Sequence, residues 1–147
     1  MKKKIIYPIG LVVLLFVCTI EYFQPLSFTD IIGENHRIDI IINTFAIEDG
    51  KPEIESVTYD DITTKQEENI FSLLENYSYR RTIDTWFSDG SITDIKDKSL
   101  SIFVYDDDSS VATILVGSSG KIAVNDKTYR MADGDQFIAQ TIELLGF

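Results

Sequence analysis

Asp106, Asp107 and Asp108 form the densest acidic group of the sequence, between two apolar segments. Neighbouring carboxylates can hold a hard cation such as calcium, and a pair of carboxylates across a cleft can hydrolyse a glycosidic bond. The group lacks the alternating Asp residues, the Gly and the closing Glu of a helical-loop calcium site. A solvated hairpin turn is therefore our main interpretation. A calcium or small-ligand site and a carboxylate-dependent cell-wall glycan hydrolase are the alternatives.

Arg80-Arg81 and Trp86-Phe87 are the other side chains suited to binding. A guanidinium group binds phosphate and carboxylate oxygens at two points, and an exposed aromatic pair marks a protein interface or a sugar-stacking site. Because neighbouring strand residues point to opposite faces, we do not expect both arginines to serve one site. We expect surface or structural pairing for the arginines, and burial of at least one of the two aromatic rings in the core.

The sequence contains one histidine, His36, and one cysteine, Cys18. Zinc sites of the usual type need several such residues, and a Ser-His-Asp or Cys-His catalytic site would have to use His36. That histidine stands in a polar run that predicts a surface loop. The sequence has no phosphate-binding or dinucleotide-binding glycine motif. We therefore predict a non-enzymatic protein with no catalytic residue, no resident metal and no cofactor.

The N-terminal residues have the pattern of an export or membrane-anchoring segment. Lysines at positions 2–4 precede an apolar run over residues 5–20. Lysines stay on the cytoplasmic side of a membrane, so the rest of the chain is expected outside the cytoplasm. A helix of about 24 Å is short of the hydrocarbon core of about 30 Å, and Tyr22 and Phe23 can extend it through the interface. A small-residue cleavage site is missing, which favours a retained anchor over secretion.

Cys18 lies near the end of the apolar run. Leu15-Phe16-Val17-Cys18 resembles the acylation site of a bacterial lipoprotein in having a leucine three residues before the cysteine. It departs from that pattern at Val17, where a small residue is usual. An ordinary thiol in a membrane helix is the alternative interpretation, because a free cysteine behaves as a small hydrophobe. Both interpretations place the protein on the membrane.

The chain has 147 residues and a net charge of −11. This acidity opposes binding to nucleic acid, which requires clustered basic residues. We predict a cytoplasmic tip and signal anchor over residues 1–23, a juxtamembrane spacer over residues 24–36, and one extracytoplasmic domain over residues 37–147. A single cysteine excludes an internal disulfide, so the domain must depend on its core.

Hydrophobic periodicity predicts the elements of that domain. Period-two alternation and turn dipeptides such as Asp49-Gly50 and Asn125-Asp126 indicate hairpins, whereas a period near 3.6 indicates helices. Thr63 or Thr64 and Asp133 are suited to cap the two helices, and Gly146 to end the second. The predicted strands cover residues 37–47, 51–59, 79–86, 100–105, 111–116, 121–124 and 127–131, and the predicted helices cover residues 63–77 and 133–146.

This order of elements predicts an α+β fold. We expect a two-layer sandwich, in which two helices pack on one face of a mainly antiparallel sheet, preceded by the N-terminal membrane-anchor helix. The other face of the sheet would then be partly exposed to solvent and available for binding.

Three segments carry a resemblance: Ser27 to Gly33, the helix end Leu73-Leu74-Glu75-Asn76-Tyr77, and Lys121 to Arg130 before the last helix. Together with the anchor, they resemble a group of small membrane-anchored or lipoprotein-like Gram-positive surface proteins of uncharacterised function. The resemblance implies an exported single domain and supplies no catalytic residues. It favours a membrane-tethered module that binds an envelope protein or a wall polymer.

Overall fold

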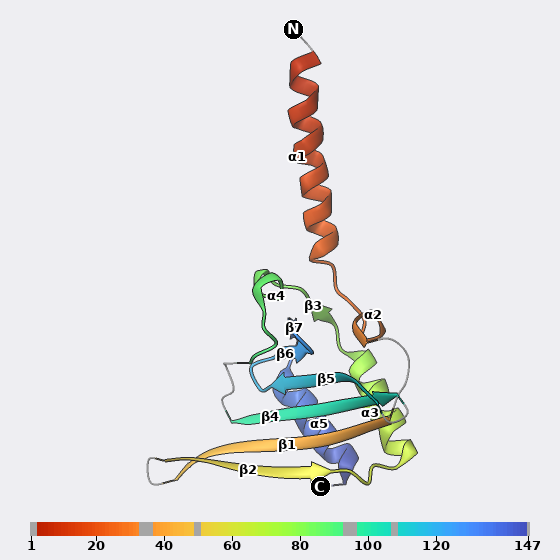
Figure 1. Cartoon of the computed structure of the whole chain (residues 1–147), viewed down its shortest axis with the longest axis vertical. Coiled ribbons are helices and arrows are strands. Elements are labelled where there is room, and N and C mark those ends of the chain that lie inside the picture. The colour runs from red at the N-terminus through yellow and green to blue at the C-terminus, as the bar shows by residue number, and fades with distance from the viewer. Residues whose placement is uncertain (1–2, 33–36, 49–50, 93–96, 107–108, 147) are drawn as a thin grey trace.

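The computed structural model describes residues 3–32, 37–48, 51–92, 97–106 and 109–146, and Figure 1 shows their arrangement. An isolated helix leads into a domain that combines a sheet with shorter helices. In chain order the elements are α1 (Lys3–Tyr22), α2 (Thr29–Ile32), β1 (Arg37–Glu48), β2 (Lys51–Tyr59), α3 (Thr64–Asn76), β3 (Tyr79–Arg80), α4 (Ile83–Phe87), β4 (Lys98–Asp106), β5 (Ser109–Gly117), β6 (Lys121–Val124), β7 (Lys127–Met131) and α5 (Gly134–Leu145).

The sheet is antiparallel in every pairing that the structure describes, with the strand order β2-β1-β4-β5-β6-β7-β3. Ile40 lies opposite Tyr59 on one side and opposite Ile102 on the other, and Ile102 lies opposite Ile114. Ile40, Ile102 and Ile114 are all fully buried. Alternation thus sends one residue in two toward a single core, as a half-covered sheet requires.

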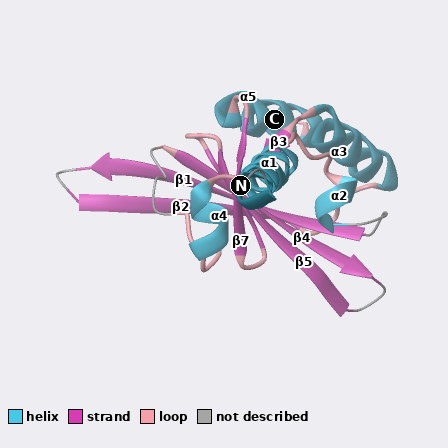
Figure 2. Ribbon diagram, turned by 90° about the horizontal axis from the view of Figure 1, so that it is seen from above, coloured by secondary structure: helices cyan, strands magenta, loops and turns pink. Residues whose placement is uncertain are grey.

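Two helices supply the rest of the core. Ile70 and Leu74 of α3 belong to one buried cluster with Phe137 and Ile138 of α5 and the inward residues of the strands. The helices contact each other, and α5 also contacts β4 and β5. Figure 2 shows α3 and α5 together on one side of the sheet.

The α+β class and the antiparallel sheet are confirmed, and so are the hairpins β1–β2, β4–β5 and β6–β7. The helix count is different: five helices occur in the described ranges instead of three, because α2 and α4 are additional.

The predicted strand over residues 79–86 is wrong, since β3 ends at Arg80 and α4 follows. A hydrogen bond explains the change. The Thr85 hydroxyl oxygen accepts from the backbone N–H of Thr82 at 2.8 Å and donates to the carbonyl of Thr128 at 2.6 Å, which fixes a helical turn on β7.

The caps differ in how well the sequence predicts them. Thr63 caps α3 through a reciprocal exchange with Gln66, as expected. Gly146 ends α5 in the left-handed region with φ of 95°, also as expected. Asp133 stands at the N-cap of α5, but its own φ is 51° and its side chain makes no capping hydrogen bond. The prediction of a side-chain cap at Asp133 is therefore wrong.

The segment predicted as a spacer takes part in the domain. Leu26 and Tyr79 exchange two backbone hydrogen bonds, of 2.8 and 3.2 Å. Phe28 is buried in the core cluster, and its ring lies 6.1 Å from the ring of Tyr79. The chain between α1 and β1 is therefore fastened to the domain before the first long strand begins.

Among the residues that the structure describes, none of the helices combines the length and the hydrophobicity needed to cross a membrane. The described side chains of α1, from Ile9 to Ile20, are exposed throughout.

Candidate functional site

The C-terminal end of α1 is held against the domain by two side chains. Arg81 donates from Nη1 to the carbonyl of Tyr22 at 3.5 Å, and its guanidinium carbon lies 5.3 Å from the centre of the Tyr22 ring. The Trp86 ring centre lies 4.8 Å from that of Tyr22, with the planes at 51°. We call Tyr22, Arg81 and Trp86 the junction. A cation suits the negative end of a helix dipole and the face of an aromatic ring, so the junction orients α1 relative to the domain.

Tyr129 of β7 lies in the electrostatic field of the junction. Partial burial raises the pKa of the Tyr129 hydroxyl above its ordinary value, while Arg81 opposes that shift and Tyr22 adds to it. Tyr129 therefore stays protonated at neutral pH and adds no charge. The positive charge of Arg81 acts at the α1 terminus together with the nearby carboxylates of Asp30 and Asp126.

α4 is turned the opposite way from an ordinary surface helix. Its buried residue is Thr85, whose hydroxyl is bonded to β7. Ile83, Trp86 and Phe87, at positions i, i+3 and i+4, point outward with exposed fractions of 65%, 61% and 83%. Residues at this spacing share one helical face, which in a soluble domain normally covers the core. We call Ile83, Trp86 and Phe87 the α4 apolar face.

The structure separates the two arginines that the sequence placed side by side. Arg81 belongs to the junction, whereas Arg80 pairs across β3 and β7 with Arg130. Arg80 and Arg130 line a shallow pocket of about 290 Å³ with Ser78, Met131 and Ala132. The expectation that Trp86 or Phe87 would be buried is wrong, since both are exposed. Thr85 takes the inward position of α4 and donates its hydroxyl to β7.

The predicted acidic site is not tested by the structure. Asp107 and Asp108 lie outside the described residues, as does His36, and Asp106 is described only as the last residue of β4. Within the described ranges, no group of three His, Cys, Asp or Glu residues is placed to hold a metal ion. The metal and hydrolase alternatives therefore stay predictions. Cys18, the predicted lipidation site, is exposed on α1.

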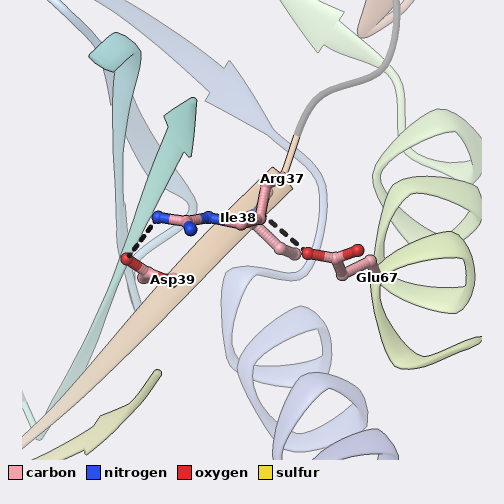
Figure 3. A network of polar contacts seen from close by, with 4 residues as sticks. All are labelled: Arg37, Ile38, Asp39 and Glu67. Atoms are coloured by element: carbon pink, nitrogen blue, oxygen red, sulfur yellow. Dashed lines mark hydrogen bonds and ion pairs between the residues drawn. The ribbon is translucent and has the colours of Figure 1, made fainter. Parts of the chain in front are cut away.

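A groove of about 510 Å³ lies beside α3, lined by Arg37, Thr64, Glu67, Glu68, Phe71, Ser72 and Glu75. Glu67 accepts from the backbone N–H of Ile38 at 3.2 Å, while Arg37 turns away toward Asp39 at 3.9 Å (Figure 3). Glu75 accepts from the N–H of Thr29 at 3.0 Å and from its hydroxyl at 2.8 Å. Two of the groove's three carboxylates thus connect α3 to β1 and α2.

The sheet face opposite the core is polar and half-buried over much of its area. Arg37 and Asp39 of β1 begin it, and the guanidinium carbon of Arg37 lies 5.1 Å from the ring centre of Tyr105. Ile41 and Leu115 are partly exposed on the same face and add apolar surface to it. We call the partly or fully exposed part of this surface the open sheet face; its described members are Arg37, Asp39, Ile41, Asn43, Phe103, Tyr105, Thr113 and Leu115. Ser99 and Ser101 point to the same side of the sheet but are buried.

The sequence singled out Arg81, Trp86 and Phe87 and placed Tyr22 at the membrane interface, but it did not reveal Ile83 or the contacts of Tyr22 with the domain. The signal for Ile83 was available in its spacing from Trp86 and Phe87, which fits one helical face, but the assumption of a strand concealed it. The contacts of Tyr22 could be found only from the fold, because they lie about sixty residues along the chain.

Searches of protein-family models, curated proteins and solved structures find no match to this chain. Function is therefore inferred from the residues of this chain, and the resemblance to Gram-positive surface proteins stays a prediction.

Proposed function

We propose that this protein is a non-enzymatic binding module tethered to the outer side of a bacterial cell membrane. The observation that carries the proposal is the contrast between α1 and the domain. The apolar side chains of α1 are exposed and lie away from the core, while Figure 1 shows the helix projecting from the domain. The exposed apolar residues of α1 are Ile9, Leu11, Val12, Val13, Leu14, Leu15, Phe16, Val17 and Ile20.

We infer that α1 meets the bilayer through its exposed apolar side chains, although its described residues do not combine the length and hydrophobicity of an independent membrane span. The run over residues 5–20 makes a helix of about 24 Å, against a hydrocarbon core of about 30 Å. Local thinning of the bilayer and interfacial aromatic residues can accommodate such a mismatch, and Tyr22 and Phe23 stand where the run ends. The lysines at positions 2–4 favour a cytoplasmic N-terminus, and we infer from this that the domain lies outside the cytoplasm.

The proposed architecture is a two-layer domain in which α3 and α5 cover one sheet face and leave the open sheet face for a partner. Arg37 and Tyr105 supply a cation and an aromatic ring there, and Ile41 and Leu115 supply apolar area. Such a mixture suits a protein surface or a wall polymer. The proposed partner is an envelope protein or a wall polymer.

Cys18 offers a second form of the same anchor. Its thiol is exposed on α1, three residues after Leu15. Mass spectrometry of the mature N-terminus separates the forms, because a retained helix begins at Met1 or Lys2 and a lipoprotein begins at a diacylglycerol-modified Cys18.

Liposome flotation of the full chain tests the tether. Leu14→Arg puts a charge into the middle of α1, which costs about 2.5 to 3.5 kcal/mol at a helix centre in a bilayer. Ile54→Arg on β2 is the matched control, since Ile54 and Leu14 are exposed to 63% and 59%. We expect the parent chain and Ile54→Arg to float and Leu14→Arg to float less. A parent chain that stays in the aqueous fraction overturns the proposal.

A further inference from the structure

Apart from the contact of Trp86 with Tyr22, the α4 apolar face is exposed in the described part of the chain, although α4 is attached to β7. Thr85 holds the helix to β7 through a buried hydroxyl, so α4 cannot simply turn its apolar residues inward. Phe87 is the most exposed of the three, at 83%. Large apolar side chains gathered on one helical face indicate a docking surface for an apolar environment.

The position of this face identifies the environment. Trp86 contacts Tyr22 at the last turn of α1, and Phe23 follows as a further exposed aromatic residue. Figure 1 shows α4 at the end of the domain from which α1 projects, and Figure 2 shows α4 beside α1 when viewed along that helix. A bilayer that holds α1 therefore has its interface at the level of α4.

We propose that the α4 apolar face inserts into the lipid interface and fixes the domain against the membrane surface from which α1 emerges. This inference rests on the proposed membrane tether and adds a second contact to it. Trp86 and Tyr22 would belong to an interfacial aromatic belt, where amphipathic rings sit at the level of the headgroups. The domain would then have one orientation, with β2 at the end away from the membrane (Figure 1).

The chemistry of α4 indicates how it binds. The helix Ile83–Phe87 contains no basic residue and one acidic residue, Asp84, and the whole chain has a net charge of −11. The nearest cation of the junction, Arg81, is held on Tyr22, so we expect attraction to anionic headgroups to contribute little to the contact. Burial of apolar area drives the contact, and an interfacial helix of this kind reaches about 5–10 Å into the boundary between headgroups and acyl chains. The contact should form on zwitterionic lipid and should not depend on salt.

Trp86 is the only tryptophan, which makes it a reporter for this contact without any substitution. The full chain is reconstituted into phosphatidylcholine vesicles with or without bromine atoms on the acyl chains near the headgroups. We expect about a twofold or larger loss of Trp86 fluorescence with brominated lipid, because the ring would lie within the interfacial region. The loss should be the same at low and high salt.

A matched pair of variants tests whether the apolar face causes the quenching. Ile83→Ser with Phe87→Ser removes two of its side chains and leaves the reporter, and we expect most of the quenching to disappear. Ile54→Ser with Val57→Ser removes two exposed apolar side chains of β2 and should leave the quenching unchanged. A second reporter, Trp86→Phe with Ile54→Trp, should show little quenching because β2 lies away from the membrane.

The outcomes separate this inference from the tether. A chain that does not float with the vesicles contradicts the tether itself. A chain that floats while Trp86 is not quenched, or while both pairs of serine variants give the parent quenching, overturns the α4 contact and leaves the tether intact. With the chain in vesicles, quenching of Trp86 by a water-soluble quencher at the level seen for the Ile54→Trp reporter would also contradict the contact.

Discussion

The core of the domain and the junction with α1 are two regions that are held together by different kinds of contact. In the core, long strands place residues such as Ile40, Ile102 and Ile114 in direct cross-strand register, and each is fully buried. At the junction, Arg81 and Trp86 contact Tyr22 through one long hydrogen bond and ring contacts, and Trp86 remains mostly exposed. The first region determines whether the domain folds. The second determines how the domain is held relative to α1.

The difference should appear most strongly in stability. Ile102→Ala removes a fully buried side chain that has cross-strand partners on both sides, and we expect a loss of about 2–5 kcal/mol in the free energy of unfolding. Trp86→Ala at the junction should cost about 1 kcal/mol or less, because the ring is largely exposed. Urea unfolding followed by circular dichroism measures both. Equal losses would contradict the division between the two regions.

Gly134 and Gly10 differ in how closely the backbone around them is packed. A Cβ on Gly134, at the start of α5, would lie 2.5 Å from the carbonyl oxygen of Gly117 and 2.7 Å from the amide nitrogen of Gly120. Both neighbours are backbone, so Gly134→Ala should cost about 1–3 kcal/mol. A Cβ on Gly10 in α1 would meet nothing within 4 Å. Gly10→Ala is therefore the control and should leave domain stability unchanged in the same urea titration.

The buried hydroxyl of Tyr79 should make the stability of the domain depend on pH. Its hydroxyl donates to the carbonyl of Leu74 at 2.8 Å, and burial raises the pKa of that hydroxyl above its ordinary value of 10.0, with Glu75 adding to the shift. Below pH 10 the group is protonated in both the folded and the unfolded chain, so its contribution to stability is full. Above pH 10 the unfolded chain ionises first, and stability falls as the pH rises toward the folded pKa.

Tyr79→Phe should cost about 1 kcal/mol at neutral pH, because the buried carbonyl of Leu74 loses its donor from Tyr79. It should also make the fall in stability above pH 10 shallower. Unfolding curves at pH 7 and at several pH values above 10 measure both effects. If the stability of the variant falls as steeply as that of the parent, ionisation of Tyr79 is not the cause of the loss above pH 10.

The smallest energetic effect and a clear structural one are expected at Arg81. Arg81→Gln removes the cation over Tyr22 and should cost about 1 kcal/mol or less. Spin labels at Cys18 and at a cysteine replacing Ile54 should report a broader distance distribution, because α1 loses its orientation. Arg80→Gln is the control, since Arg80 pairs with Arg130 on β7 instead. A distribution that stays narrow in Arg81→Gln would show that the junction does not orient α1.

The sequence predicts the elements that local signals determine, and it fails where a contact between distant residues decides the structure. Alternation at Ile38, Ile40 and Ile42 and the turn at Asn125-Asp126 are local signals, so the long strands and hairpins could be predicted. The segment over residues 79–86 has a strand-like composition, but Thr85 fixes a helix there through the carbonyl of Thr128, forty-three residues away. Local pattern cannot contain such a contact.

The residues of the candidate binding surfaces could be selected from the sequence, but their arrangement could not. Trp86, Phe87 and Arg81 could be selected by residue type alone, since aromatic rings and guanidinium groups are common in binding surfaces. Their arrangement could not be predicted, because it depends on the position of α1 and on the outward turn of α4. Asp133 fails as a side-chain cap for a related reason: its backbone lies in the left-handed region, with φ of 51°, and Gly134 follows against the β5–β6 turn.

Protease treatment of intact protoplasts, with the membranes then extracted at alkaline pH, tests the central claim most directly. The account predicts that the domain is digested before the cells are lysed, while undigested protein from untreated cells stays in the membrane fraction after extraction. A domain that stays intact until lysis, or a chain that alkaline extraction releases into the supernatant, would contradict the account.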